Sequence, residues 1–293
     1  MPKDFGKVIC AMVTPFDADL NVNYEQGVKL AERLIQEGND TILLAGTTGE
    51  SPTLSTEEKL LLFEKVVGAI KGRALIMAGT GGNNTKTSIE LSKEAEKIGV
   101  DGLLLVVPYY NKPPQDALYA HFKAIADSVS LPIVLYNVPS RTVANLEPST
   151  VAKLAQIENI IGIKEACGNM DQVSQLKMLV PEDFKIYSGD DSLTLPMLSL
   201  GCHGVVSVAS QVVGVEIKKM INLFMEGKVD QAKDIHYQLL PVFKAMFINT
   251  NPIPVKAALN LKGFDVGSVR LPLLELDEQG KGVVLEALKP FFN

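Results

Sequence analysis

The sequence is poor in the residues that build disulfide frameworks and metal centres. It contains three cysteines and three histidines in 293 residues. Cys10, Cys167 and Cys202 are odd in number and far apart, which disfavours a disulfide framework and is typical of a reducing compartment. The histidines are equally scattered and match no zinc-ligand spacing. We therefore expect no catalytic metal.

Blocks of like charge and long apolar runs are absent as well. The net charge is −6, without the clustered Lys and Arg that the phosphates of a nucleic acid require. Small molecules are therefore the expected partners. No apolar run is long enough to span a membrane, and residues 1–10 lack the basic stretch, apolar core and cleavage site of a signal peptide. We expect a cytoplasmic protein.

The chain has enough apolar material for one large barrel with an appendage. Its hydrophobic content of 46% and charged content of 21% are ordinary for a soluble globular protein. Eight short runs rich in apolar and β-branched residues predict strands. They span residues 8–14, 41–45, 74–78, 102–107, 132–136, 160–164, 184–188 and 204–208. Most are apolar on both faces, which is typical of a parallel sheet covered on each side.

Amphipathic segments with helix end signals separate these runs. Residues 23–38 begin with a possible Asn cap and end on glycine, and Ser55 and Glu58 have capping-box spacing before a further helix. The other segments lie at 85–98, 115–128, 148–157, 170–180 and 191–200. Eight repeats of strand and helix predict a (β/α)₈ barrel, because the alternative, an open doubly wound sheet, commonly has five or six strands.

The last part of the chain has no strand signals. Beyond residue 211 the pattern predicts only helices, at 216–226, 228–247, 253–261 and 278–292. We assign residues 1–224 to the barrel and residues 225–293 to a C-terminal helical domain packed on it.

Polar residues gather where the predicted strands end. In a (β/α)₈ barrel the active site lies at the carboxyl ends of the strands, so these residues should form one ring. In chain order they are Thr14, GTTGE at 46–50, GTG at 79–81, PYYN at 108–111, Tyr136 with Asn137 and Arg141, Lys164 with Glu165, SGDD at 188–191 and Ser207.

Lys164, at the end of the sixth run, suits imine chemistry. Burial after the apolar residues 160–163 disfavours the charged ammonium and favours the neutral, nucleophilic amine. Such an amine attacks a ketone to give a Schiff base, whose nitrogen accepts electrons while a carbon–carbon bond forms or breaks. The alternative is a lysine that leans outward and pairs with Glu165 or another carboxylate. The sequence permits a lysine-dependent aldolase or lyase.

The neighbours of Lys164 in this ring extend the hypothesis and leave alternatives open. Tyr136 closes the adjacent fifth run, where a phenol can relay protons or pack as a core aromatic. The GTTGE turn offers backbone N–H groups and hydroxyls to a small carboxylate, or is a plain strand-to-helix turn. Arg141 can grip a second carboxylate with its guanidinium, or lie on the surface as most arginines do.

Six motifs occur in order along the chain, namely GTTGES at 46–51, VVPYYNKP at 106–113, YNVPSRT at 136–142, GIKEA at 162–166, SGDD at 188–191 and NPIPVKAALN at 251–260. With them the chain resembles the dihydrodipicolinate synthase and N-acetylneuraminate lyase family over essentially its whole length. The resemblance implies a (β/α)₈ barrel with a helical C-terminal domain, assembled as a tetramer of two tight dimers. It also implies that pyruvate condenses with L-aspartate 4-semialdehyde, the first committed step toward diaminopimelate and lysine, without a cofactor.

The resemblance implies roles for four catalytic residues. Lys164 matches the lysine that forms an imine with pyruvate, and Tyr136 matches the tyrosine that relays protons to and from it. Thr47 matches the hydroxyl that links this tyrosine to a second one. Tyr110, which the sequence alone places on the barrel rim or in a subunit contact, matches the second tyrosine, which reaches across the tight dimer interface into the partner's site.

Four further residues are assigned to substrate binding. Thr48, with the neighbouring backbone amides, resembles the clamp on the pyruvate carboxylate. Arg141 resembles the arginine that positions the carboxylate of the aldehyde. Gly189 and Val206, in the seventh and eighth βα units, complete the set.

Two other functions are compatible with part of this set of residues. Another pyruvate-dependent lyase of the family, such as N-acetylneuraminate lyase or a keto-deoxy sugar acid aldolase, shares the lysine and the tyrosine. The sugar-cleaving relatives usually lack an arginine at the position of Arg141, which favours a short substrate with its own carboxylate. A non-catalytic, small-molecule-binding barrel would need a loss among the four catalytic residues, and none is lost.

The resemblance also implies an effector site near a dimer interface. Lysine-inhibited relatives bind lysine there, and Ser51, Asn83 and Tyr109 match their pattern. Where the sensitive enzymes carry a histidine and a glutamate, this chain has Lys59 and Thr87. An added cation and a lost carboxylate both disfavour a cationic effector. We predict poor or absent feedback inhibition by lysine.

Overall fold

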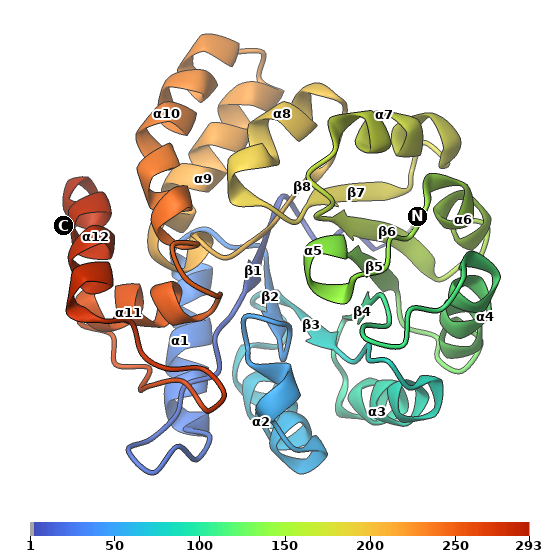
Figure 1. Ribbon diagram of the computed structural model, residues 1–293, viewed down its shortest axis with the longest axis horizontal. Coiled ribbons are helices and arrows are strands. Elements are labelled where there is room, and N and C mark those ends of the chain that lie inside the picture. The colour runs from blue at the N-terminus through green and yellow to red at the C-terminus, as the bar shows by residue number, and fades with distance from the viewer. Residues whose placement is uncertain (1–2, 293) are drawn as a thin grey trace.

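The computed structural model describes residues 3–292 and confirms the predicted barrel. Eight parallel strands pair in chain order and the last pairs with the first, which closes the sheet (Figure 1). The strands are β1 (Val8–Ala11), β2 (Thr41–Leu44), β3 (Leu75–Gly79), β4 (Gly102–Val106), β5 (Ile133–Asn137), β6 (Ile160–Glu165), β7 (Lys185–Ser188) and β8 (Gly204–Ser207). Each corresponds to one predicted run.

The first strand is shorter than its run of apolar residues. It ends at Ala11, whereas the sequence predicts an end at Thr14. The backbone N–H of Val13 donates to Oε1 of Gln211 at 3.1 Å, and Gln211 also donates to the carbonyl of Ala11 at 2.9 Å. The side chain of Gln211, from the eighth βα unit, therefore satisfies backbone groups at the end of β1 in place of a neighbouring strand.

A ring of helices covers the barrel (Figure 1). Its members are α1 (Tyr24–Gln36), α2 (Thr56–Ile70), α3 (Thr85–Ile98), α4 (Gln115–Ala126), α6 (Pro148–Leu154), α7 (Met170–Leu179), α8 (Thr194–Ser199) and α9 (Ser210–Met225). The predicted caps are present: the side chain of Asn23 accepts from the N–H of Gln26, and Ser55 and Glu58 form a complete capping box.

Two helical features differ from the prediction. A short helix, α5 (Pro139–Thr142), follows β5 in a segment for which no helix is predicted. Helix α9 begins at Ser210, six positions before the predicted start, and the backbone of Val213 inside it is not helical (φ −140°, ψ 40°). The periodic pattern is readable only beyond this kink, which explains the late predicted start.

The core consists of two shells. Side chains that point into the barrel pack against one another, among them Ile9, Leu43, Leu104 and Val206. A larger shell fills the space between the strands and the helices. Strand β6 carries an irregularity beside Ile133, where Ile160 and Gly162 pair with consecutive residues of β5. Beyond it the two strands run in register to their carboxyl ends.

The C-terminal helices pack on one side of the barrel, beside α1 and α9 (Figure 1). They are α10 (Val229–Ala245), α11 (Ile253–Leu261) and α12 (Glu278–Leu288). We propose that the division between barrel and extension falls between residues 224 and 225, at the end of α9. Every helix in residues 3–292 is too short or too polar to cross a bilayer.

Candidate active site

Lys164 and Tyr136 come from neighbouring strands and lie side by side. They are register partners in the parallel pair of β5 and β6, so their side chains point to the same face of the sheet. Both are buried, with exposed fractions of 5% and 6%. The amine nitrogen of Lys164 lies 4.2 Å from the centroid of the Tyr136 ring. A buried amine and a phenol thus share one small space at the carboxyl ends of the strands.

Glu165 does not pair with Lys164, so that alternative is wrong. The ion pairs that lysines form within residues 3–292 do not include Lys164. The carboxylate of Glu165 accepts from the side chain of Asn137 at 3.0 Å and from the backbone N–H of Cys167 at 2.9 Å. Burial raises the pKa of Glu165, although these hydrogen bonds oppose the shift.

Gly189 leaves the room that the stem of Lys164 occupies. Its N–H donates to the carbonyl of Glu165 at 2.8 Å, which holds the end of β7 against β6. A Cβ at this position would lie 3.1 Å from Cε of Lys164 and 2.6 Å from Cβ of Ala166. Val206 lies inside the barrel and is buried. Gly189 thus adjoins the stem of Lys164, and Val206 belongs to the cluster inside the barrel.

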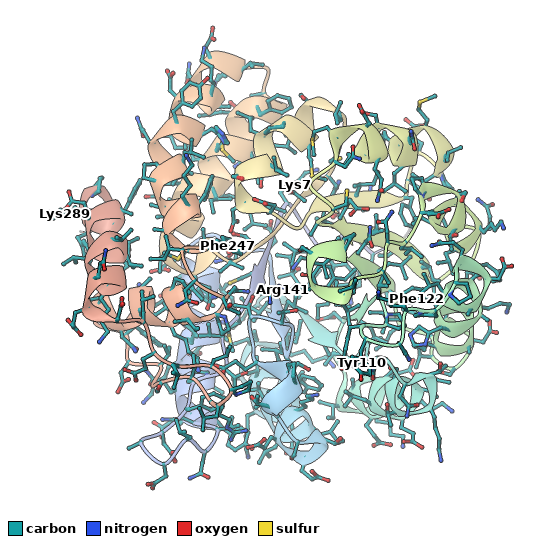
Figure 2. The ribbon with its side chains drawn as sticks, in the orientation of Figure 1. Lys7, Tyr110, Phe122, Arg141, Phe247 and Lys289 are labelled. Carbon is teal, nitrogen blue, oxygen red and sulfur yellow. The ribbon has the colours of Figure 1, made fainter. Side chains whose placement is uncertain are left out.

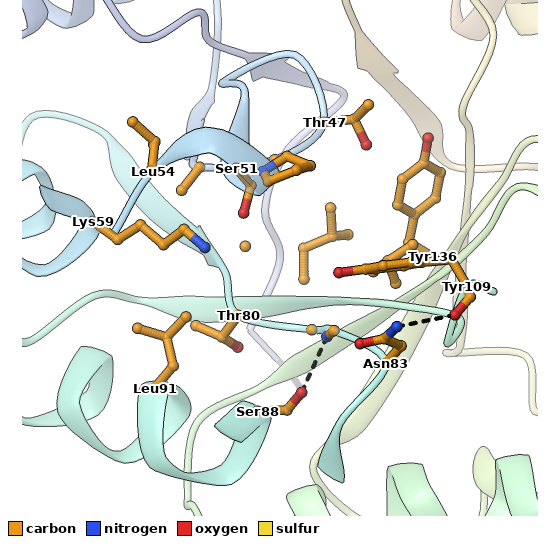
Figure 3. A pocket seen from close by; sticks show the side chains of 18 of the residues that line it. Thr47, Ser51, Leu54, Lys59, Thr80, Asn83, Ser88, Leu91, Tyr109 and Tyr136 are labelled. Atoms are coloured by element: carbon orange, nitrogen blue, oxygen red, sulfur yellow. Dashed lines mark hydrogen bonds between the residues drawn. The ribbon is translucent and has the colours of Figure 1, made fainter. Parts of the chain in front are cut away.

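A cavity of about 450 Å³ opens at this end of the barrel. Thr47, Tyr136 and Arg141 line it. In Figure 3, Thr47 and Tyr136 lie at one end of the cavity and the side chain of Lys59 points in from the other. All five predicted effector residues line the same cavity, namely Ser51, Lys59, Asn83, Thr87 and Tyr109. The cavity thus runs from the predicted effector residues to Thr47, Tyr136 and Arg141, whereas Lys164 itself does not line it.

Arg141 reaches the cavity from the unpredicted helix α5 and lies over the middle of the barrel (Figure 2). The helix starts at Pro139, a residue whose fixed φ suits a first helical turn. It ends at Thr142, and the next residue, Val143, adopts a left-handed conformation with φ 54°. The ion pairs within residues 3–292 do not involve the Arg141 guanidinium. It is thus placed to bind an incoming carboxylate.

The GTTGE turn is held from several directions. Thr14 donates its hydroxyl to the carbonyl of Gly49 at 2.7 Å, and Gly49 packs so closely that a Cβ would lie 3.2 Å from the carbonyl oxygen of Met12. Thr48 is buried, and its hydroxyl oxygen accepts from the side chain of Asn251 at 2.9 Å. This bond leaves the hydroxyl hydrogen of Thr48 for another acceptor.

Asn251 is a site residue that the sequence reasoning missed. It precedes α11 and lies some 200 positions from the turn, so only its place in the NPIPVKAALN motif pointed toward it.

Tyr110 is not brought to Lys164 within one chain. Its side chain is 89% exposed and its backbone is left-handed with φ 74°. Figure 2 shows it in the loop on the α3 side of the molecule. The neighbouring Tyr109 is different, because it lines the cavity and its carbonyl accepts from the side chain of Asn83 at 3.2 Å (Figure 3).

Metal-ligating side chains do not cluster in the described part of the chain. Among residues 3–292 no three His, Cys, Asp or Glu side chains are arranged to hold a metal ion. That the chemistry needs no metal stays a prediction from the sequence.

Comparison with known proteins gives the same family from sequence and from structure. The model of the dihydrodipicolinate synthetase family matches residues 4–290. A 4-hydroxy-tetrahydrodipicolinate synthase from Desulforamulus reducens is 56% identical over 93% of this chain and 92% of that protein. The crystal structure of a dihydrodipicolinate synthase from Bacillus anthracis superposes with a TM-score of 0.96 at 46% identity and covers 99% of both chains.

A second solved structure is similar to the same extent. The enzyme from Cyanidioschyzon merolae, solved with lysine bound, has a TM-score of 0.95 at 46% identity over 97% of both chains. Sequence, barrel and candidate site agree over nearly the full length, and we conclude that this chain belongs to the dihydrodipicolinate synthetase family.

Proposed function

We infer that this chain condenses pyruvate with L-aspartate 4-semialdehyde to give 4-hydroxy-tetrahydrodipicolinate, the product for which its relatives are named. The reaction belongs to the biosynthesis of diaminopimelate and lysine. The observation that carries the inference is the register pair of Lys164 and Tyr136, both buried, beside a cavity that Arg141 also lines. A buried amine without an ion-pair partner can act as the nucleophile that forms a Schiff base, and a neighbouring phenol can relay the protons.

The first half of the mechanism takes place on pyruvate. The amine of Lys164 attacks the ketone carbon, and loss of water gives an imine. Tyr136 relays protons to the leaving hydroxyl, because its ring lies against the amine. The imine then loses a proton from the methyl group to become an enamine, and its nitrogen accepts the electrons of the broken C–H bond.

The second half joins the two substrates. The enamine carbon attacks the aldehyde carbon of the semialdehyde, which forms the new carbon–carbon bond and restores the imine. The amino group of the former semialdehyde then attacks the imine carbon, closes the ring and expels the Lys164 amine. Arg141 binds the carboxylate of the aldehyde substrate, since its guanidinium lines the cavity and forms no ion pair in the described part of the chain.

The GTTGE turn serves the pyruvate end. Thr48 and the neighbouring backbone N–H groups bind the pyruvate carboxylate. Thr47 lines the cavity and passes protons between Tyr136 and a second tyrosine. Gly189 and Val206 shape the space around the bound keto acid, because they adjoin the lysine stem and the barrel interior.

The second tyrosine comes from a neighbouring subunit. Tyr110 is exposed and does not line the cavity of its own chain, which suits a residue donated across a tight dimer interface. The assembly is a homotetramer of two such dimers, and the enzyme works in the cytoplasm. Lysine inhibits it weakly or not at all, because Lys59 points into the cavity and Thr87 adds no carboxylate there.

One experiment tests the chemistry directly. Pyruvate and borohydride are added to the protein, and mass spectrometry of its peptides locates the reduced adduct. The adduct is expected on Lys164, absent in Lys164→Ala, and unchanged in a control, Lys86→Ala, whose lysine side chain is 85% exposed. A wild-type protein without an adduct at Lys164 would refute the mechanism.

A second experiment distinguishes the two aldolase readings. Turnover of aspartate semialdehyde with pyruvate is compared with cleavage of sialic acid by the same preparation. Faster turnover of sialic acid would refute the substrate assignment and leave the Schiff base in place.

A further inference from the structure

A buried ion pair lies directly behind the GTTGE turn. The amine of Lys256 in α11 lies 2.7 Å from Oε1 of Glu50, the last residue of the turn, and the two side chains are 2% and 1% exposed. Neither residue lines the candidate active-site cavity. The pair therefore connects the C-terminal extension to the loop that carries Thr47 and Thr48, without touching the substrate space.

The other polar and cation–π contacts of the two side chains lead to the C-terminal extension or to the loop after β1. The amine of Lys256 donates to the carbonyl of Ser268 at 2.6 Å and lies 3.9 Å from the centroid of the Phe16 ring. The second oxygen of Glu50 accepts from the backbone N–H of Arg270 at 3.0 Å. The Arg270 guanidinium lies 4.5 Å from the same Phe16 ring, so two cations share one aromatic side chain.

The segment after α11, which Figure 1 shows in orange and red beside α1, extends toward α2. There Arg270 donates to the carbonyl of Thr53 at 2.8 Å and forms two bonds to Glu58 of the α2 capping box, at 2.9 and 2.5 Å. Asn251, also in the extension, donates to Thr48. The C-terminal extension therefore contacts the GTTGE turn and the start of α2 at several points.

The backbone conformation of Glu50 depends on these contacts. Glu50 is a non-glycine residue in the left-handed region, with φ 54° and ψ 36°, a conformation that persists only where the surroundings enforce it. Its N–H donates to the carbonyl of Thr47 at 3.1 Å, so the conformation of Glu50 and the placement of Thr47 are coupled. A buried ion pair is often no more stabilising than an apolar pair of the same volume, so stability alone does not account for it.

We propose that Lys256 is a positioning residue: through Glu50 it sets the conformation of the GTTGE turn, and so the geometry of the Thr47 and Thr48 groups that act on pyruvate. The C-terminal extension is then part of the catalytic scaffold. This proposal rests on the proposed function, because it assumes that the turn serves the imine-forming step.

The test uses the full-length protein and a charge-neutral double variant. Single changes, Lys256→Met and Glu50→Gln, each leave a buried charge without its partner, whereas the double variant removes both charges and largely retains the volume. The control is Lys262→Met, a half-buried lysine of the same extension that donates to the carbonyls of Val212 and Phe291 and does not contact the turn. Folding is followed by circular dichroism and thermal unfolding.

We expect the double variant to fold, with an unfolding midpoint near that of Lys262→Met. Trapping by pyruvate and borohydride should be about 10- to 100-fold slower than in the wild type, because small misplacements of catalytic groups have effects of this size. The KM for pyruvate rises and kcat falls, whereas the KM for the aldehyde stays the same, because Arg141 is held by α5. A general loss of packing would raise both KM values.

A folded double variant that traps pyruvate at the rate of the wild type would overturn the proposal, and so would equal changes in the two KM values. If this double variant does not fold, a second one, Lys256→Gln with Glu50→Gln, removes both charges and keeps a donor for the carbonyl of Ser268, and it is judged by the same two outcomes. The same trapping experiment on the wild-type protein separates this proposal from the proposed function. If pyruvate and borohydride give no adduct with the wild type, the proposed function itself is refuted.

Discussion

Replacing Gly189 with alanine tests whether the fit around the Lys164 stem matters for catalysis. The new Cβ would lie 3.1 Å from Cε of Lys164 and 2.6 Å from Cβ of Ala166, whereas ordinary contact begins at 3.4 Å. The lysine stem and the end of β6 must both give way. Such overpacking costs about 1–3 kcal/mol of stability, and a displacement approaching 1 Å at the amine slows the reaction by up to about 100-fold.

The assay is the rate of borohydride trapping with pyruvate, read beside thermal unfolding. The matched control is Gly68→Ala in α2, where an added Cβ meets no atom within 4 Å. This change should stabilise the helix by about 0.5–1 kcal/mol and leave trapping unaltered. A Gly189→Ala protein that forms the adduct as fast as the wild type would show that the lysine does not depend on this packing, and the reasoning would fail.

Four further predictions concern the roles of individual side chains and of the residue pair Lys59 and Thr87. Tyr110→Phe should lower kcat by about 100-fold or more, as the loss of a proton-relay group does, without lowering the unfolding midpoint, because the change removes only a hydroxyl from a side chain that is exposed within its own chain; an unchanged rate would contradict a shared site. Arg141→Ala should raise the KM for the aldehyde by about 10- to 100-fold, the worth of a charge-assisted hydrogen bond, and an equal rise for pyruvate would place the arginine elsewhere. Millimolar lysine should leave the rate nearly unchanged, whereas the double change Lys59→His and Thr87→Glu should increase inhibition; strong inhibition of the wild type refutes the electrostatic argument. Burial lowers the pKa of His121 from 6.5 to about 4, so the unfolded chain takes up the proton first and stability falls as the pH drops through that interval. His121→Gln should flatten this part of the curve of unfolding midpoint against pH, and an unaltered slope would mean that other groups cause it.

The barrel could be predicted because its signals are local. A strand of a parallel sheet buries both faces, so β4 and β5 appear as apolar runs bounded by turn residues, and eight such runs specify the closed sheet. Lys164 could be singled out for the same reason, since a lysine that closes an apolar run contradicts the pattern around it. Its register partner, Tyr136, followed from the order of the strands.

The remaining features depend on contacts between distant parts of the chain. Val13 leaves the ladder because its N–H donates to Gln211, and Thr48 accepts from Asn251, which lies 203 positions away in the sequence. Neither partner has a local signal. The ion pair of Glu50 and Lys256 was missed because an isolated charge in a sequence is normally a surface charge. Only tertiary structure brings the two together.

The shared cavity has a consequence for control of the enzyme. Lys59 and Tyr136 border one hollow, with no wall of the fold between them. A molecule held at the Lys59 end would displace solvent from the cavity that Tyr136 and Arg141 line, and it would narrow the space left for a second substrate beside Arg141. Binding at the Lys59 end would then affect the Tyr136 end through the water and the bound molecules in the cavity, without a movement of the strands.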